Sequence, residues 1–358
     1  MPRRAPSALA CGNRRADAQR HDRSLRAIAH ARPRPDGGAG SERKGGESGA
    51  RGSGSTGEGL APTFSRRVSA SLTERLAELH VHLEGTISHA TASELAAAHG
   101  LAPPPPYEYS DLSGFMAIYR DVCRCMTTAD DFERVIVEHA RAMATQHIAY
   151  AELSINPSLH PGEGWVDGMV RARRRVVDEF GVEIAWLVEL VRGESMEDNE
   201  RALEIALATE GVVGLGLVGD ESIPSSPLLP LVQRARARGL RFMPHAGQVG
   251  DASVVREAVE VLRADRIAHG VSAVDDASLL NVLATRDICL CVCPSSNARI
   301  GRRPDFRMLA ASGVALTVNS DDPAMVGTTL THELDLAEAD HGLRRDDMIS
   351  AAWRYSFK

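Results

Sequence analysis

The sequence has no long hydrophobic run. No stretch of eighteen apolar residues occurs, and no basic-then-apolar segment typical of a secretion signal opens the chain, so we predict neither a membrane span nor export. Cysteine is also scarce, because six residues in 358 form no dense framework of the kind found in secreted disulfide-rich domains. These absences favour a globular protein of the cytoplasm with no membrane partner.

Lysine is nearly absent, since Lys44 and Lys358 are the only two among 41 basic residues. Residues 1–67 hold 14 of these basic residues against six acidic ones, a net charge of +8, and are rich in Gly, Ser, Pro and Ala. We expect a disordered extension there, although a transit peptide or a tail that contacts nucleic acid has a similar composition. Residues 68–358 form the expected folded domain, and their net charge of −15 argues against nucleic acid as a partner.

From residue 76 onward, short apolar runs alternate with amphipathic stretches. Strands are expected at 78–82, 148–155, 182–190, 212–218, 240–245, 266–270, 288–293 and 314–320. Helices are expected between them, for example at 131–145, 196–209, 228–238, 253–263 and 276–285. This alternation predicts a (β/α)8 TIM barrel, and residues 107–128 are expected to cover one of its mouths. An open doubly wound sheet alternates similarly, but no glycine-rich phosphate loop follows the first strand.

Polar residues gather where three of these strands end. His80 and His82 end the first strand, and their spacing of two places both imidazoles on one face of it. His245 ends the fifth strand, and Asp321 with Asp322 ends the eighth. In a barrel these ends meet at the rim that carries activity. Three imidazoles and a carboxylate around an open position predict a catalytic zinc site, with one Zn²⁺ per chain.

The other histidines and the cysteines receive no functional role. A single histidine on an apolar element is more often a hydrogen-bonded core residue than a metal ligand. Cys289, Cys291 and Cys293 alternate along the seventh strand and are expected to be buried there as small apolar side chains. Cys123 and Cys125 share no helix face at a spacing of two, so they predict no redox pair.

Six sequence motifs resemble those of adenosine deaminases, in the same order. They are Glu78-Leu-His-Val-His-Leu-Glu-Gly85, Gly219-Asp-Glu221, His245-Ala-Gly247, Arg266-Ile-Ala-His-Gly270, Cys293-Pro-Ser-Ser-Asn297 and Asn319-Ser-Asp-Asp-Pro323. The resemblance covers about residues 76–357 and implies a zinc-bearing barrel that hydrolyses the 6-amino group of a purine nucleoside, adenosine or 2′-deoxyadenosine.

The resemblance also implies a role for each matching residue. The zinc ligands it implies are His80, His82, His245 and Asp321. His269 corresponds to the histidine that orients the attacking water. Asp322 corresponds to the carboxylate that holds purine N7, and Gly219 to the glycine whose N–H meets N3. Glu84 occupies the acidic position that contacts the ribose, where many members of the family have Asp.

Gln248 departs from the family pattern, which has Glu after His-Ala-Gly. A carboxyl donates a proton to N1 and later passes one to the leaving amine, whereas an amide only donates a hydrogen bond. Loss of such acid–base catalysis costs about 10²–10⁴-fold in rate. Three explanations stay open, namely drift under weak selection, a substitution that traps substrate, and altered chemistry with another acid.

Smaller departures occur in the strands. Gly216 stands where an Asp is usual, which predicts a missing carboxylate behind the metal ligands. Ala268 replaces a Gly, and Ser154 replaces an Arg. These departures keep two alternatives open beside the deaminase, a catalytically silent nucleoside-binding barrel and an amidohydrolase that acts on another ring. A cytidine-type deaminase is disfavoured, because no Pro-Cys-x-x-Cys pair accompanies His82-Leu-Glu84.

Overall fold

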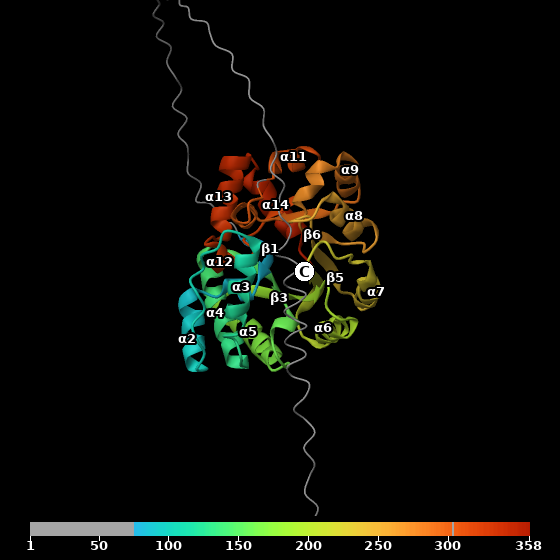
Figure 1. The fold of residues 1–358 in the computed structure, drawn as a ribbon. Coiled ribbons are helices and arrows are strands. Elements are labelled where there is room, and N and C mark those ends of the chain that lie inside the picture. Colours follow the sequence, from blue (N-terminus) through green and yellow to red (C-terminus); the bar gives the residue numbers. More distant parts are fainter. Residues whose placement is uncertain (1–74, 303) are drawn as a thin grey trace, which may run out of the picture. The chain divides into compact units, whose positions relative to one another are not determined.

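The computed structural model describes residues 75–302 and 304–358, so the predicted extension at 1–67 lies outside the described residues. Eight parallel strands pair in chain order from β1 to β8 and lie inside a ring of helices (Figure 1). A parallel bridge between Val81 and Asp321 joins the last strand to the first. The predicted (β/α)8 barrel is therefore confirmed. The strands are β1 Leu76–His82, β2 Ile148–Ile155, β3 Glu183–Val191, β4 Val212–Val218, β5 Arg241–Ala246, β6 Arg266–His269, β7 Cys289–Val292 and β8 Leu316–Val318.

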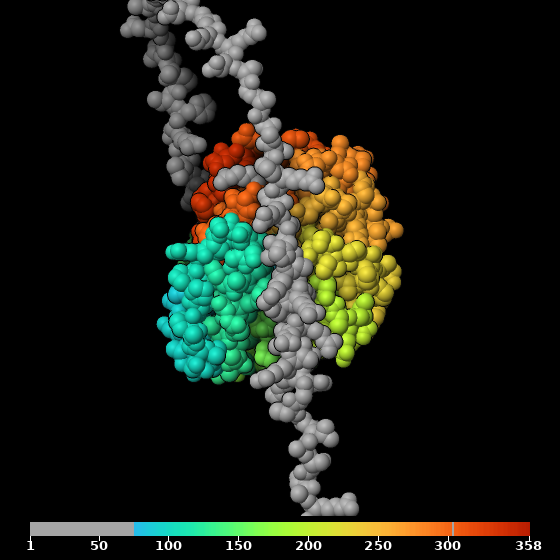
Figure 2. Space-filling model, in the orientation of Figure 1, coloured from blue at the N-terminus to red at the C-terminus, as the bar shows by residue number. Residues whose placement is uncertain are grey.

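The helices follow one another around the strands, and the described surface runs in chain order around the barrel (Figure 2). Those between β1 and β5 are α2 His89–Ala98, α3 Leu112–Cys123, α4 Ala129–Thr145, α5 Trp165–Phe180, α6 Met196–Ala208 and α7 Leu229–Ala237. The later ones are α8 Ala252–Glu260, α9 Ala277–Thr285, α10 Pro294–Arg299, α11 Phe306–Ala311, α12 Pro323–Val326, α13 Leu330–His341 and α14 Arg345–Tyr355. The five helices predicted above all form, and their ends shift by no more than three residues.

The strands are apolar because both of their faces are covered. Every residue of β1, β2 and β7 is buried, as expected for a sheet with helices outside and side chains filling its interior. The outer core lies between strands and helices. The inner core includes Leu79, Tyr150, Leu187, Met243 and Cys291. Burying a large apolar side chain stabilises the fold by about 1.5–3 kcal/mol, so these two layers hold the barrel together.

The segment between α2 and α4 reaches over one mouth of the barrel, as the sequence predicted. Asp111 begins α3 by accepting a hydrogen bond from the backbone N–H of Gly114. Tyr109, which precedes this helix, donates from its hydroxyl to the carbonyl of Met325 and lies under the guanidinium of Arg299 at 4.6 Å from its ring centroid. These contacts fix the covering segment to the loops after β7 and β8.

An ion pair lies inside the barrel near the first residues of the strands. Arg266 and Glu152 are both 0% exposed, and their side chains form a salt bridge. Arg266 also donates to the carbonyl of Tyr355 at 2.6 Å and stacks 3.6 Å from the ring centroid of Phe357. The residues after α14 therefore close this end of the barrel, the end opposite to the rim where the strands finish.

Within the described residues, no helix has the length and apolarity required to cross a membrane. The five cysteines of the described chain, Cys123, Cys125, Cys289, Cys291 and Cys293, are all buried and unpaired. Burial in the core, as predicted for the three cysteines at 289–293, is confirmed.

Candidate active site

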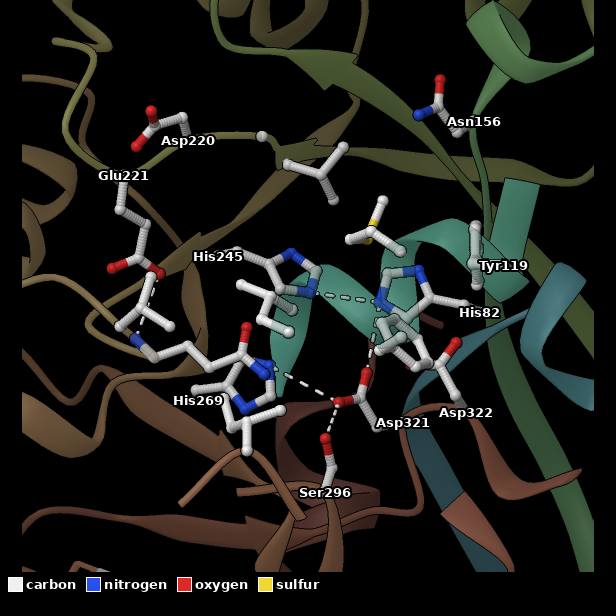
Figure 3. A pocket seen from close by; sticks show the side chains of 18 of the residues that line it. His82, Tyr119, Asn156, Asp220, Glu221, His245, His269, Ser296, Asp321 and Asp322 are labelled. Carbon is white, nitrogen blue, oxygen red and sulfur yellow. Dashed lines mark hydrogen bonds and ion pairs between the residues drawn. The ribbon is translucent and has the colours of Figure 1, made fainter. Parts of the chain in front are cut away.

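Five polar side chains from four parts of the barrel converge at one rim, and four of them, His82, His245, His269 and Asp321, are labelled in Figure 3. His80 and His82 come from the end of β1, His245 from β5, His269 from the end of β6, and Asp321 from the turn after β8. All five are buried, with at most 8% of any residue exposed. The strand ends place them together because parallel strands all finish at the same rim.

Three imidazole nitrogens and one carboxylate oxygen face a common point. Nε2 of His245 lies 3.1 Å from Nε2 of both His80 and His82. Oδ1 of Asp321 lies 3.3 Å from the same two nitrogens. A tetrahedral zinc ion with bonds of about 2.0–2.1 Å separates its ligand atoms by about 3.3 Å. These four separations are close to those in a tetrahedral zinc site, so the geometry is compatible with the predicted ligand set.

Two of the predicted ligand residues, Asp321 and His245, accept further hydrogen bonds from neighbouring side chains. Ser296, in α10, donates its hydroxyl proton to Oδ2 of Asp321 at 2.6 Å. Asp321 has φ of +64°, a conformation that non-glycine residues adopt infrequently and that persists only where neighbours enforce it. Arg192 donates to the carbonyl oxygen of His245 at 2.6 Å. Both contacts lock the direction in which the ligand atoms point.

His269 lies beside the four predicted ligands, and with His80, His245 and Asp321 it forms a group whose possible ligand atoms all lie within 4.8 Å of one another. Its Nε2 lies 3.7 Å from Oδ2 of Asp321, and both ring nitrogens are buried without a hydrogen-bond partner in the described chain. Burial, with the neighbouring imidazoles, lowers the pKa of His269 to about 3, so the ring is neutral at pH 7. A neutral, partnerless imidazole at this position is able to accept a proton or a hydrogen bond from a small molecule.

Four of the five side chains, those of His82, His245, His269 and Asp321, line a cavity of about 990 Å³, a volume that includes its open mouth. Its walls are largely apolar and include Leu112, Phe115 and Met116 of the covering segment. None of the lining residues is Lys or Arg, whereas several are acidic. The acidic residues of the lining are Glu189, Asp220, Glu221, Asp321 and Asp322. The cavity therefore suits a small molecule without negative charge.

Gln248 lines the cavity on a loop that Glu221 holds in place. The carboxylate of Glu221 accepts backbone hydrogen bonds from Gly247 at 2.9 Å, Gln248 at 3.0 Å and Gly250 at 2.7 Å. Gly247 has φ of +74°, and a Cβ there would meet Ser272 Oγ at 2.3 Å, so this turn requires glycine. The backbone around residue 248 is thus fixed independently of its side chain.

Gly219 and Asp322 also line the cavity. Gly219 has φ of +99°, and a Cβ there would lie 2.9 Å from the carbonyl oxygen of Arg192. Oδ1 of Asp322 is buried without a partner in the described residues, and burial together with Asp321 raises the pKa of Asp322 well above its usual value. A Cβ at Gly85 would collide with this carboxyl, so the glycine after Glu84 leaves room for Asp322.

Glu84 lies behind the cavity wall and is not among the lining residues. It is 0% exposed, and it accepts hydrogen bonds from Nε2 of His160 at 3.0 Å, the N–H of Asn156 at 3.1 Å and the hydroxyl of Tyr119 at 3.2 Å. Asn156 and Tyr119 do line the cavity. The ribose contact of Glu84 stays a prediction, and the structure shows a carboxylate that fixes two wall residues.

Sequence reasoning gave no role to several of these supporting residues. Glu221 and Ser296 lie within the recognised motifs, but only the structure shows what they bind. Glu189 is a buried carboxylate among apolar residues close to the end of β3, whose other glutamate, Glu183, stands at its first position, and this placement was the signal available in the sequence. Ser154, in place of the expected Arg, has a buried hydroxyl without a partner among the described residues.

A family comparison agrees with the fold. The profile of adenosine deaminases matches residues 76–354. The chain belongs to the adenosine deaminase family. It is 36% identical over 284 residues to an aminodeoxyfutalosine deaminase of Streptomyces avermitilis, covering 73% of this chain and 79% of that protein. It is 33% identical over 318 residues to an adenine deaminase of Cupriavidus taiwanensis, covering 79% and 90%.

A solved structure of the family supports the same architecture. The crystal structure of adenine deaminase from Arthrobacter aurescens is similar with a TM-score of 0.75 and 27% identity, covering 80% of this chain and 94% of that one. The predicted resemblance is thus confirmed at the level of family and fold. Because the relatives are named as deaminases, family membership supports a hydrolytic enzyme that acts on a small molecule.

Proposed function

We propose that the protein is a zinc-dependent hydrolase that removes the 6-amino group of a purine nucleoside, or of a related 6-aminopurine, as ammonia. The observation that carries the proposal is the close approach of His80, His82, His245 and Asp321, the last three of which line a cavity. Zinc held by such a set, with one position open, lowers the pKa of a water molecule and supplies a nucleophile near neutral pH.

His269 and Asp322 provide the remaining polar chemistry. The neutral ring of His269 accepts a hydrogen bond from the attacking water and directs a lone pair of that water toward C6. The carboxyl of Asp322 has a raised pKa, and its Oδ1 has no partner among the described residues, so in its protonated form it donates to a purine nitrogen such as N7. The N–H of Gly219 lies at the cavity wall as a further donor, to N3.

Gln248 limits the rate of this reaction. Its side-chain amide donates a hydrogen bond to N1 of the purine but does not transfer a proton to the ring or to the leaving amine. The proton therefore comes from water. We expect slow turnover compared with a Gln248→Glu variant, by about 10²–10⁴-fold.

The composition of the cavity favours an uncharged substrate. A 5′-phosphate would meet acidic residues and no Lys or Arg among the lining residues, so nucleosides and free bases bind in preference to nucleotides. Adenine and aminodeoxyfutalosine, for which relatives are named, are therefore tested beside adenosine and 2′-deoxyadenosine.

Gln248 also supports a second candidate, a nucleoside-binding barrel without turnover. The test measures ammonia release and product mass for the four compounds with wild type, Gln248→Glu and the control Gln233→Glu on the exposed face of α7. Turnover that rises at least a hundredfold in Gln248→Glu, and not in the control, supports a deaminase with a weakened acid. Binding without turnover in the wild type and activity only in Gln248→Glu supports the silent barrel. No turnover by any variant that carries stoichiometric zinc contradicts 6-aminopurine deamination.

A further inference from the structure

His82 contacts a carboxylate through the ring nitrogen that faces away from the other ligands. Glu189, on β3, is 2% exposed, and its Oε1 lies 3.2 Å from Nδ1 of His82. Nε2 of the same ring faces His245 and Asp321. The ring of His82 therefore lies between the other predicted ligand atoms and the buried carboxylate of Glu189 on β3.

The three ligand imidazoles differ in this respect. Nδ1 of His80 has neutral partners, the carbonyl oxygen of Cys291 at 3.3 Å and Sγ of Cys293 at 3.4 Å. Nδ1 of His245 is buried without a partner in the described residues. Within the described chain, His82 is therefore the ligand ring whose outer nitrogen meets a negative charge.

The strand beside β3 leaves space for Glu189. The sheet register pairs Glu189 with Gly216 of β4. A Cβ at Gly216 would lie 3.1 Å from Cγ and 3.5 Å from Oε1 of Glu189, so any larger residue crowds the carboxylate. The sequence predicted that a carboxylate would be missing because position 216 is Gly. The structure shows a carboxylate in the adjoining space, supplied by the neighbouring strand.

We propose that Glu189 is a positioning residue for the metal site. Its Oε1 faces Nδ1 of His82 as an ion-pair contact, without a hydrogen bond in this structure. With a metal on Nε2, the N–H at Nδ1 donates to this carboxylate, which keeps Nε2 free for the metal and makes the ring a stronger ligand. This inference rests on the zinc site of the proposed function. Carboxylates behind a metal-binding histidine typically contribute 10–100-fold to metal affinity, and we expect that size of effect here.

The test compares zinc affinity in full-length variants, measured by competition with a chelator. Glu189→Ala is expected to bind zinc 10–100-fold more weakly, and Glu189→Gln somewhat less so, because its amide oxygen still accepts from Nδ1–H. Glu183→Gln, at the other end of the same strand, is the matched control and is expected to bind as the wild type does. Cobalt in place of zinc gives an absorption spectrum that reports ligand geometry, and it is expected to change in the two Glu189 variants alone.

Two Gly216 variants test the shared space. Gly216→Ala is expected to weaken zinc binding without altering any ligand, because its methyl group displaces Glu189. In the double variant Glu189→Ala with Gly216→Asp, a carboxylate returns from β4 and is expected to restore most of the lost affinity. Loss of folding is monitored separately by far-ultraviolet circular dichroism.

The outcomes separate this inference from the proposed function. A wild type that holds no zinc overturns both. A wild type that holds one zinc, with unchanged affinity and cobalt spectrum in both Glu189 variants, overturns the role of Glu189 and leaves the deaminase proposal intact. Two zinc ions per native chain overturn it as well, since Glu189 would then be a ligand rather than a support for His82.

Discussion

The ion pair inside the barrel yields a prediction whose size follows from its surroundings. Arg266 and Glu152 are fully buried, and each satisfies further partners. Glu152 accepts from the hydroxyl of Tyr150 at 3.0 Å and from the N–H of Phe357 at 2.5 Å. The perturbation is the replacement of each charged residue by Met, singly and together, as Glu152→Met and Arg266→Met.

Each single replacement leaves one charge without its counterion in a low-dielectric interior. Removing one member of a buried pair costs about 3–5 kcal/mol, and the orphaned donors of Tyr150 and Phe357 place Glu152→Met at the upper end of that range. The double replacement removes both charges and keeps the volume nearly constant, so it is expected to cost less than either single change. The coupling free energy is therefore expected to exceed about 3 kcal/mol.

The assay is urea unfolding of the four proteins at pH 7, followed by circular dichroism. A double-mutant cycle gives the coupling, and zinc content of the folded variants serves as the control, because the pair lies away from the metal rim. Additive effects, with the double variant losing as much as the two single variants combined, would refute the reasoning. Such additivity would mean that each side chain stabilises the barrel through packing alone.

Three further predictions concern stability and binding. Burial lowers the pKa of His139 to about 4, compared with 6.5 in the unfolded chain. As the pH falls from 6.5 toward 4, the unfolded state therefore takes up a proton before the folded state does, and the free energy of unfolding decreases. Relative to His139→Leu, the wild type is expected to lose about 2 kcal/mol of unfolding free energy between pH 7 and 5, and parallel pH profiles would contradict this. Zinc at a hundred times its dissociation constant is expected to stabilise the fold by about 2.7 kcal/mol, and an equal melting temperature after chelation would contradict it. Asp322→Ala is expected to lose about tenfold or more in kcat/KM with zinc content unchanged. Asp322→Asn, whose side-chain amide still donates a hydrogen bond, is expected to lose less. Equal losses in the two variants would argue against hydrogen-bond donation to the purine.

Much of the fold was predictable, because each strand is a short apolar run covered on both faces. The prediction differs most from the structure at the eighth strand, which was expected at 314–320 and spans Leu316–Val318. Between Val318 and Asp321, hydrogen bonds to β1 run through side chains, and backbone hydrogen bonds resume between Asp321 and both His80 and His82. Asn319 accepts from the N–H of Leu79, and the N–H of Ser320 donates to Glu78. Apolar patterning does not distinguish such side-chain pairing from a regular ladder.

The convergence of the predicted ligand side chains could be expected from the sequence, whereas the side chains that support them could not. His80 and His82 share a face through the two-residue period of a strand, and parallel strand ends coincide at one rim, so local rules suffice for them. The position of Glu189 depends on the register of β3 against β4 and on the missing side chain at Gly216. The fit of Glu189 beside Gly216 depends on two separate segments of the chain, so neither segment predicts it alone.

The closure of the barrel has a consequence for how the protein matures. His82 and Asp321 sit where the first strand meets the turn after the last, and the neighbouring pair Leu79 and Asn319 is separated by 240 residues of sequence. Contacts so distant in the chain form late and slowly during folding. During synthesis, a ribosome must release residue 321 before all four ligands exist in one place. If the proposed metal site is correct, metal therefore binds to all four residues only after β1 and the turn after β8 have come together. A nascent chain cannot form the complete site earlier.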